Sequence, residues 1–413
     1  MTETINLSAK IEEKLPAELV DFMRQAGEAA TARGQKLYLV GGVVRDLLLG
    51  RANLDLDLVL EGDAISLAEQ LAGTGGRRLK THPRFGTAKV QWQRWSVDLT
   101  TARSETYDKP GALPKVKPGS LADDLFRRDF TINAMAVELA PGSYGHLIDP
   151  YRGLDDLGSK LVRILHPVSF IDDSTRIWRG LRYEQRLDFH LEADTLRLLK
   201  RDVPMLDTIS GDRLRHELEM VLREERPEKV LRRAGELGVL SQLYPGLTGD
   251  DWLAEKYADA RTAGSSSVEV YLALLAYRLT GEETEGLISR LRLPNPLART
   301  LRETVSLKAR LPLLADAKIA PSRIYRLLEG NSLPAITASL LAADSAVARQ
   351  HIRLYLDRLR YVRPTLTGRD LQQMGIAPGP RMKEILERLH EARLDGKVTS
   401  KKGEEEMVRG WIF

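Results

Sequence analysis

The stretch LYLVGGVVRDLLLGRANLDLDLVL, residues 37–60, decides how the chain folds. It predicts a buried strand over 37–40, a turn at Gly41-Gly42, a short helix, and a second strand in which Asp55 and Asp57 alternate with leucines. Side chains two positions apart on a strand share one face. Both carboxylates are therefore expected to point one way, while the leucines between and beside them point into a core.

The acidic pair and the glycine turn together predict a site for a metal and a phosphate. Two carboxylates held this close repel each other unless a cation neutralises them, and Mg²⁺ prefers oxygen ligands. Glycines let backbone N–H groups approach a phosphate at a helix start, where the helix dipole favours anions. Arg45, one turn into the predicted helix, adds a charged donor. We expect this stretch to hold a divalent cation and a triphosphate.

The length and composition of the chain limit the class of protein that carries this site. A chain of 413 residues holds two to four domains, and 43% apolar with 29% charged residues is ordinary for a soluble globular protein. No apolar run approaches the roughly 20 residues of a spanning helix, and no secretory leader opens the sequence. The absence of cysteine excludes disulfides and thiolate-bound zinc. We expect a cytoplasmic protein without a membrane segment; its net charge of +4 permits a polyanionic partner.

A third candidate carboxylate lies further along the N-terminal part of the chain. Residues 9–33 predict a helix interrupted at Pro16, and residues 77–100 contain three alternating apolar runs that predict strands of one mixed sheet. Asp98 lies on the last of these runs. Two-metal phosphoryl transfer uses acids that bridge the ions and one acid beside the attacking hydroxyl. Asp98 is the candidate for that third acid; the alternative is a surface aspartate on an edge strand.

The segment 104–120, SETYDKPGALPKVKPGS, is punctuated by glycine and proline. Such a sequence predicts a mobile loop without a regular element. Arg103 and Glu105, at its start, are candidates for coupling the loop to the site. In RRDFTINAMAVEL, residues 127–139, two adjacent arginines are candidates for triphosphate or ribose contacts, and Asn133 for hydrogen bonds to sugar hydroxyls. A lone pair of arginines would otherwise indicate surface charge.

The string FIDDSTRIWRGLRY, residues 170–183, places Asp173, Arg176, Arg179 and Arg182 on one slowly drifting stripe of a helix. Taken alone, this spacing indicates a helix stapled by Asp–Arg pairs at spacing i, i+3.

These motifs together resemble those of class II tRNA nucleotidyltransferases, the CCA-adding enzymes and bacterial poly(A) polymerases of the polymerase-β superfamily. VGG, VRD, LLG and DxD resemble the first motif of that family, and RRDFTINAMAVEL the second. IDPYRGLDDL, residues 148–157, resembles the turn that closes the catalytic head. FIDDSTRIWRGLRY resembles the E-D-x-x-R-x-x-R motif, with Asp172 in place of glutamate, and ISGDRLRHELEMVL, residues 209–222, resembles a fifth, structural motif.

The resemblance implies an α+β fold, with a small mixed-sheet nucleotidyltransferase head followed by an elongated all-helical neck, body and tail. The expected divisions are a head over 1–160, a neck over 161–235, a body over 236–320 and a tail over 321–413. In the tail, a Gly-Pro turn opens a predicted helix that carries Arg381 and Lys383. These two side chains are the candidates for contacts with tRNA.

The implied reaction is Mg²⁺-dependent transfer of CMP and AMP from CTP and ATP to the 3′ end of tRNA, with release of pyrophosphate. Asp55 and Asp57 are expected to hold the metal, and Asp98 to activate the hydroxyl. Asp173 and Arg176 are expected to select the base, as an alternative to stapling the helix. Cytosine and adenine both present an amino donor beside a ring-nitrogen acceptor; the aspartate accepts from the amino group and the arginine donates to the ring nitrogen. Uracil and guanine reverse this pattern and would leave buried polar groups unpaired, at about 1–3 kcal/mol each. The full set of expected nucleotide-binding residues is Gly41, Gly42, Arg45, Arg127, Arg128, Asn133, Asp173, Arg176, Arg179 and Arg182.

Several narrower or different functions compete with this one. Members of the family add CC only, A only or poly(A); a loop as long as 104–120 favours competence for adding A, and the run after the first motif resembles tRNA-directed members. A catalytically silent RNA-binding protein is the rival from another class, and the intact acids argue against it. A Rossmann dehydrogenase fits poorly, because Gly41-Gly42 lacks the GxGxxG spacing.

Overall fold

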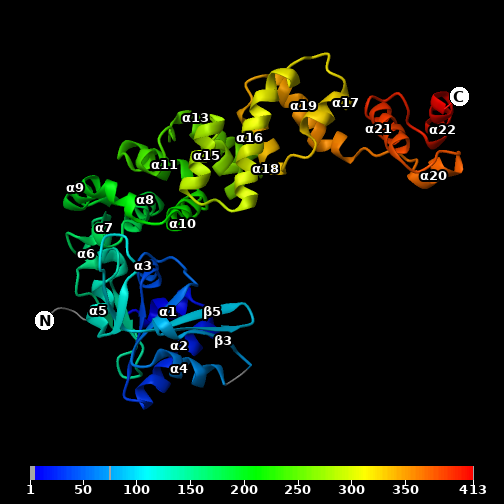
Figure 1. Cartoon of the computed structure of the whole chain (residues 1–413). Helices are drawn as coiled ribbons and strands as arrows, with labels where there is room; N and C mark the ends of the chain where they lie inside the picture. The colour runs from blue at the N-terminus through cyan, green and yellow to red at the C-terminus, as the bar shows by residue number, and fades with distance from the viewer. Residues whose placement is uncertain (1–4, 74–75, 413) are drawn as a thin grey trace. The chain divides into compact units, whose positions relative to one another are not determined.

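A computed structural model describes residues 5–73 and 76–412 and shows two compact units (Figure 1). Unit 1 runs from the N-terminus to Glu217 and includes Glu236–Leu243; unit 2 comprises Leu218–Gly235 and Tyr244–Phe413. The mixed sheet lies in unit 1, and unit 2 is helical. The predicted α+β head followed by helices is therefore confirmed, while the division into four parts stays a prediction.

The elements follow in chain order. The strands are β1 (Lys36–Val40), β2 (Leu56–Glu61), β3 (Arg78–His82), β4 (Thr87–Trp92), β5 (Trp95–Thr101), β6 (Arg103–Thr106), β7 (Lys115–Pro118), β8 (Ala136–Glu138), β9 (Leu147–Ile148), β10 (Leu161–Val162) and β11 (His190–Leu191). The first helices are α1 (Ser8–Lys14), α2 (Ala17–Ala32), α3 (Gly42–Leu48), α4 (Ala64–Ala72), α5 (Leu121–Phe126), α6 (Gly153–Gly158), α7 (Ser169–Asp172), α8 (Thr175–Leu187), α9 (Ala193–Asp202) and α10 (Gly211–Leu222). The later helices are α11 (Pro227–Glu236), α12 (Val239–Leu243), α13 (Asp251–Thr262), α14 (Val268–Leu275), α15 (Gly281–Arg290), α16 (Asn295–Leu314), α17 (Pro321–Leu328), α18 (Leu333–Ala342), α19 (Ala346–Asp357), α20 (Gly368–Gln373), α21 (Pro380–Leu394) and α22 (Lys401–Ile412).

The sheet of unit 1 has the strand order β3-β4-β5-β2-β1-β8-β9. β2 and β5 pair in parallel, and the other neighbouring strands pair antiparallel. This mixed pairing, and the three strands expected within 77–100, are as the alternating apolar runs predict. The parallel pair is the important one, because it brings two strands from separate parts of the sequence into register at the candidate acids.

The two faces of the sheet differ. On one face, α2 packs against β1 and α4 packs against β3, β4 and β5, over the buried side chains of Leu56, Leu58 and Leu60. On the other face, Val59 joins Tyr38 and the α5 residues in a second core, and Asp57 shares the face of Val59. The expectation that every neighbouring leucine is buried is wrong for Leu54, which is 47% exposed because the strand begins only at Leu56.

Two further differences from the sequence prediction concern short strands. Residues 103–118 are not irregular throughout: β6 and β7 form an antiparallel hairpin that pairs Arg103 with Pro118 and Thr106 with Lys115. Proline is tolerated there because Pro118 ends an edge strand, so only the hairpin loop over 107–114 lacks a regular element. Beyond residue 160, β10 and β11 add a small parallel pair.

Other local predictions are confirmed. Pro16 separates α1 from α2, as predicted. The segment 209–222, which resembles a structural motif, forms α10, and Ser210 accepts a hydrogen bond from the backbone N–H of Arg213 at its start, at 3.4 Å. Asp149 accepts hydrogen bonds from the backbone N–H groups of Gly153 and Leu154, at 2.7 and 2.8 Å. The segment expected to close the head thus forms a fixed turn at the start of α6.

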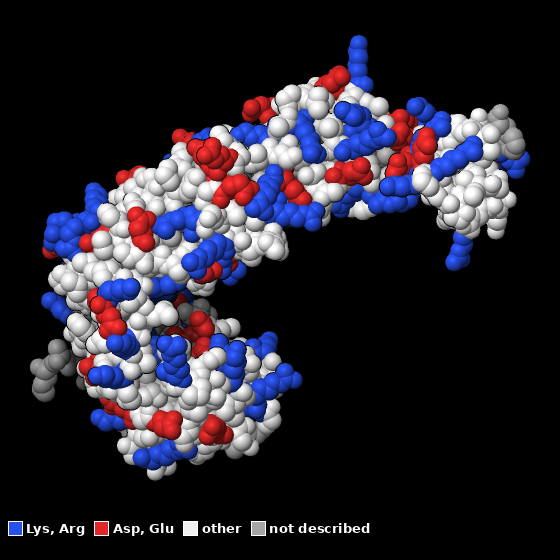
Figure 2. All heavy atoms as spheres, in the orientation of Figure 1, with Lys and Arg blue, Asp and Glu red and all other residues white. Residues whose placement is uncertain are grey.

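In unit 2 the described residues form helices without strands, as expected for the body and tail. Gly379 precedes α21, which exposes Arg381 and Lys383, and the Lys383 ammonium lies 3.8 Å from Glu387. On the face drawn in Figure 2, basic and acidic side chains lie interspersed over this unit. Within the described residues, no helix has the length and apolar character that crossing a membrane requires.

The packing of α2 on the sheet predicts an effect of substituting Gly27. A Cβ built at this position lies 2.0 Å from the Leu139 carbonyl oxygen, so alanine would push α2 away from β8. Alanine gains about 1 kcal/mol of helix propensity, but overpacking costs about 1–3 kcal/mol. We expect Gly27→Ala to lower the unfolding free energy of unit 1, measured by urea denaturation. Gly158→Ala, at a helical glycine with open space around it, is the control and should not destabilise the unit; equal effects would contradict this reading of the packing.

Candidate active site

The parallel pairing of β2 and β5 sets Asp57 directly beside Asp98. Asp55 lies one residue before β2 and is exposed. Burial raises the pKa of the Asp57 carboxyl to about 6; the positive charge of Arg128 opposes this, and the negative charges of Asp55 and Asp98 add to it. The three acids named by the sequence therefore form one electrostatic cluster.

The donor set of this cluster fits a hard divalent cation. Within the described residues, no three acidic or histidine side chains are grouped so that they could hold a metal ion by themselves. Mg²⁺, however, is commonly held by one or two carboxylates together with water and substrate phosphate. Asp55 and Asp57 supply such oxygens. The pKa of Asp57 is raised first by burial and then by the charges of Asp55 and Asp98, and a bound cation would oppose both effects. Asp98 differs from them, because the Lys89 ammonium lies 3.0 Å from its carboxylate.

The glycine turn makes room for an arginine beside these acids. Gly41 has φ +80°, and a Cβ there would lie 2.9 Å from Nη1 of Arg128 and 3.6 Å from Oδ2 of Asp57. Arg128 donates from Nη2 to Asp124 at 2.9 Å, while its Nε is buried and has no hydrogen-bond partner among the described residues. Arg128 is thus the cation that lies against both the turn and the acids.

Its neighbour Arg127 faces the β6–β7 hairpin instead. Arg127 donates to Asp124 at 2.7 Å and to Glu105 at 3.1 Å. Glu105 also accepts hydrogen bonds from Arg103 at 3.0 Å and from the Tyr107 hydroxyl at 2.9 Å. The two adjacent arginines are therefore distinguished by direction. Glu105 contacts Arg103, Tyr107 and Arg127, and the expected role of Arg103 and Glu105 in coupling the loop to the site stays a prediction.

A buried chain of polar side chains joins α3 to α8. Arg45 is paired with Asp46 at 2.9 Å and donates to the Asn133 amide oxygen at 2.7 Å. The Asn133 amide nitrogen donates to Asp129 at 3.0 Å, and Asp129 accepts from Arg179 at 2.6 and 2.8 Å. Arg45, Asn133 and Arg179 are all engaged in this chain, so their expected contacts with a nucleotide stay predictions.

Asp129 is ionised within this chain. Burial alone would raise the pKa of its carboxyl, but the positive charge of Arg179 and the hydrogen bonds from Asn133 and Arg179 lower it to about 2. The same contact raises the pKa of Arg179, above all through the charge of Asp129. This ion pair holds the sheet-side segment 127–133 against α8.

The expected base-selecting residues lie close together but do not pair with each other through their side chains. Oδ1 of Asp173 accepts from Arg213 at 2.7 Å and from the Thr175 hydroxyl at 2.6 Å. Arg176 donates to the Ser169 hydroxyl at 2.6 Å and to the Arg127 carbonyl oxygen at 2.6 Å. The alternative of Asp–Arg staples along one helix is therefore wrong for this pair, because Asp173 precedes α8 rather than lying within it.

Arg182, the last member of the predicted stripe, is buried and lies 3.4 Å from the Glu217 carboxylate. It supports the packing of α8 against α10, and its expected nucleotide contact also stays a prediction. Sequence reasoning missed Asp129, Lys89 and Arg213 as parts of the site. Asp129 stood in the RRD string, but Lys89 and Arg213 become recognisable only when β4 and α10 are brought beside the acids and Asp173.

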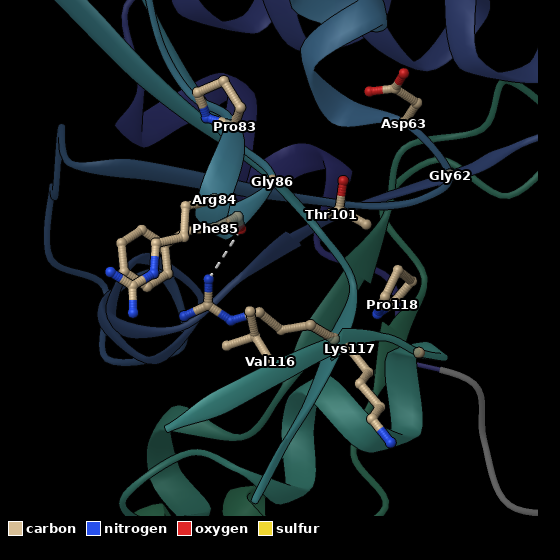
Figure 3. Close-up of a pocket in the computed structure, with 12 residues that line it drawn as sticks. Gly62, Asp63, Pro83, Arg84, Phe85, Gly86, Thr101, Val116, Lys117 and Pro118 are labelled. Carbon is tan, nitrogen blue, oxygen red and sulfur yellow. Dashed lines mark hydrogen bonds between the residues drawn. The ribbon is translucent and has the colours of Figure 1, made fainter. Parts of the chain in front are cut away.

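A pocket of about 440 Å³ lies away from the acids, at the carboxyl ends of β2 and β5 (Figure 3). Its lining comes from the β2–α4 turn, the segment between β3 and β4, and the base of the hairpin, including Arg84, Phe85 and Lys117. Arg103 donates there to the Phe85 carbonyl oxygen at 3.2 Å. Because the pocket contains none of the acids or base-selecting residues, we do not assign the reaction to it.

The chain belongs to the tRNA nucleotidyltransferase family. Residues 37–163 match the poly A polymerase head domain, and residues 188–250 match the family described as a probable RNA- and SrmB-binding site of polymerase A. The A-adding tRNA nucleotidyltransferase of Halalkalibacterium halodurans is 33% identical over 98% of this chain and 95% of its own length. The A-adding enzyme of Geobacter sulfurreducens is 36% identical over 94% of this chain, which spans only 47% of that relative.

Other relatives carry different product names. The CC-adding tRNA nucleotidyltransferase of Deinococcus radiodurans is 31% identical over 98% of this chain and 96% of its own length. Among solved structures, a CCA-adding enzyme in an apo form superposes with a TM-score of 0.85 at 31% identity, covering 99% of this chain and all of that chain. A CCA-adding enzyme with CTP gives 0.82, and the Thermotoga maritima enzyme with tRNA gives 0.80; both are 30% identical and fully covered on both sides. The expected family is therefore confirmed.

The Asp129–Arg179 pair predicts a pH-dependent contribution to stability. Because the folded-state pKa of Asp129 lies near 2, below its ordinary value, the contribution is present above about pH 4 and is lost as pH falls toward 2. The shift corresponds to about 2 kcal/mol. We expect the unfolding free energies of the native chain and Asp129→Asn to differ at pH 7 and to converge between pH 4 and pH 2, by urea denaturation. Asp155→Asn, at an exposed pair with Arg152, serves as the control. A difference that is constant with pH would contradict the assignment.

Proposed function

We propose that this protein transfers CMP and AMP from CTP and ATP onto the 3′ hydroxyl of tRNA, releasing pyrophosphate. The observation that carries the proposal is the cluster of Asp55, Asp57 and Asp98 beside Arg128, in the same unit as Asp173 and Arg176. Solved relatives described as complexes with CTP and with tRNA support this choice of substrates.

The acids and the arginine would have different roles in nucleotide transfer. Bound Mg²⁺ would neutralise charge on the triphosphate and on Asp55 and Asp57, which would hold it. Arg128, which lies against Gly41 and whose buried Nε has no hydrogen-bond partner among the described residues, would donate to a phosphate oxygen. Asp98, in register with Asp57, would orient the attacking hydroxyl and accept its proton.

Base selection would fall to Asp173 and Arg176. The hydrogen bonds of Asp173 within the described residues all go to Oδ1, which leaves Oδ2 to accept from the amino group of cytosine or adenine. Arg176, held by Ser169 and the Arg127 carbonyl, would donate to the ring-nitrogen acceptor. The Tyr107 hydroxyl lies close enough to Arg176 and Asp173 for both charges to shift its pKa. Burial raises the pKa of Tyr107 most, and the negative charge of Glu105 raises it further. The positive charge of Arg176 lowers this pKa, and the negative charge of Asp173 raises it.

A narrower product range is the second candidate. Two relatives that are 33% and 36% identical to this chain carry the name A-adding, which favours addition of the final A alone. The eight-residue segment 107–114 between β6 and β7 supports competence for A in either case. Full CCA addition and A-only addition differ in the acceptor that they extend, so the acceptor separates them.

The acid cluster predicts the outcome of an incorporation assay. Wild-type chain should extend tRNA ending in C75 with ATP, and tRNA ending before C74 with CTP only if it performs full CCA addition. Asp55→Ala should lower incorporation by about a thousandfold, because it removes a metal ligand, while tRNA binding is retained. Asp194→Ala, at an exposed surface pair with Arg197, is the control. Magnesium-dependent incorporation that survives in Asp55→Ala would refute the role of the cluster.

The hairpin loop predicts a difference between the two nucleotides. Replacing 107–114 by a two-residue Asn-Gly turn preserves the pairing of Thr106 with Lys115 and shortens the loop. We expect addition of A to fall about tenfold more than addition of C, because the loop lies against the residues that surround the base. The comparison needs full CCA activity in the wild type; in an A-only enzyme the variant should simply lose A addition. Unchanged A addition would refute the role of the loop.

A further inference from the structure

A single row of charged side chains crosses four neighbouring strands of the sheet in unit 1. Lys80 of β3 lies opposite Lys89 of β4, and Lys89 lies opposite Asp98 of β5. Asp98 in turn lies beside Asp57 of β2. Side chains paired directly across a sheet share one face. Because neighbouring strands are about 4.8 Å apart, the two lysines lie roughly 5 and 10 Å along the row from Asp98, on the face that carries the acids.

Positive charge therefore flanks the acids on two sides. On the side of β1, Arg128 lies against Asp57 at the Gly41 turn. On the side of β4, the Lys89 ammonium lies 3.0 Å from the Asp98 carboxylate. The proposed reaction has two anionic substrates, and the triphosphate is assigned to the side of Arg128. The second positive region, on β4 and β3, is left for the acceptor strand.

The outer part of this second region has no acidic partner of its own. Arg78 and Lys80 lie two residues apart on β3, so they share the face of the acids, and both are exposed. Neither forms an ion pair with the described residues. β3 is an edge strand of the sheet, where basic side chains also serve to discourage pairing with another chain. The contact of Lys89 with Asp98 is the observation that distinguishes a substrate site from such protection.

The pair of Lys89 with Asp98 is suited to an exchange of partners. Both side chains are partly exposed, 40% for Lys89 and 35% for Asp98, and an ion pair in contact with water is weak because water screens it. A lysine ammonium is a point charge on a flexible stem, so it can turn to another anion. Asp98, in contrast, has to be free of the ammonium to accept a proton from the attacking hydroxyl.

We propose that Lys89 positions the acceptor strand by exchanging Asp98 for a backbone phosphate. Before the acceptor arrives, the ammonium neutralises Asp98 and reduces its repulsion with Asp57. When the strand lies along β4 and β3, the phosphate on the 5′ side of the terminal nucleoside takes the ammonium, and Asp98 is left to face the 3′ hydroxyl. Lys80 and Arg78 contact the phosphates that precede it. This inference rests on the proposed function, since it concerns the acceptor of that same reaction.

The test pairs a change in the protein with a change in the acceptor. Lys89→Met removes the ammonium and keeps most of the stem. A methylphosphonate, placed 5′ to the terminal cytidine of a tRNA ending in CC, removes the matching negative charge. We expect each single change to lower kcat/KM for that tRNA about tenfold in extension with ATP, and the two together to lower it no further. The KM for ATP should not change. Lys200→Met, at an exposed lysine of α9, is the control and should match the wild type.

Salt dependence of binding gives a readout that does not need catalysis. Each phosphate contact with a single strand contributes about 0.7 to the slope of log affinity against log salt concentration. We expect the slope for the same tRNA, measured by fluorescence anisotropy, to fall by about 0.7 in Lys89→Met and again when Lys80→Met is added. Lys89→Arg keeps the charge, so it should keep the wild-type slope, and it guards against a folding defect in Lys89→Met.

Two results would overturn the proposal. One is a methylphosphonate effect of equal size in the wild type and in Lys89→Met, which shows that the phosphate and the ammonium act independently. The other is an unchanged salt slope in Lys89→Met. A wild-type chain that incorporates no nucleotide but shows this phosphate-dependent binding would refute the proposed function and leave the contact of Lys89 with the strand in place.

Discussion

The parallel pairing of β2 with β5 is the constraint on which the rest of unit 1 depends. It forces Asp57 and Asp98 side by side, with Asp55 close by, on a face that is partly closed to water. Burial is the main cause of the raised pKa of Asp57, and the negative charges of Asp55 and Asp98 raise it further. Two nearby cations reduce the repulsion among the three acids. Lys89 pairs with Asp98, and Arg128 lies against Asp57 at the Gly41 turn.

The second requirement is a rigid connection from the acids to α8. Arg45, Asn133, Asp129 and Arg179 form a continuous chain of buried hydrogen bonds between α3 and α8. Arg45 also lies 5.1 Å above the Tyr183 ring, and Arg179 lies 5.8 Å from it. A buried charge costs folding free energy unless it is paired and hydrogen-bonded. Each of these four side chains has a hydrogen-bond partner among the other three. Residues expected to grip a nucleotide are thus also the ones that fix the geometry of the site.

The sequence allowed prediction of what depends on periodicity and local chemistry. Alternating apolar residues predicted β3, β4 and β5, and the same repeat predicted that Asp57 lies on the face opposite the buried leucines of β2. Asp55 lies one residue before that strand, so its orientation does not follow from the repeat. The hairpin was not predicted, since its glycines and prolines hid two short edge strands. Lys89 and Arg213 were not predicted because their partners, Asp98 and Asp173, are distant in the sequence and meet them only through tertiary packing.

The contacts around Asp173 and Arg176 bear on how a protein surface can discriminate bases at all. Each wrongly paired polar group costs about 1–3 kcal/mol, or roughly five- to hundredfold. That penalty exists only if the protein groups cannot rotate to satisfy a different base. A lone aspartate and arginine could do so, but Thr175 and Arg213 hold one, and Ser169 and the Arg127 carbonyl hold the other. Selectivity in such a site therefore resides in the residues that restrain the pair as much as in the pair itself.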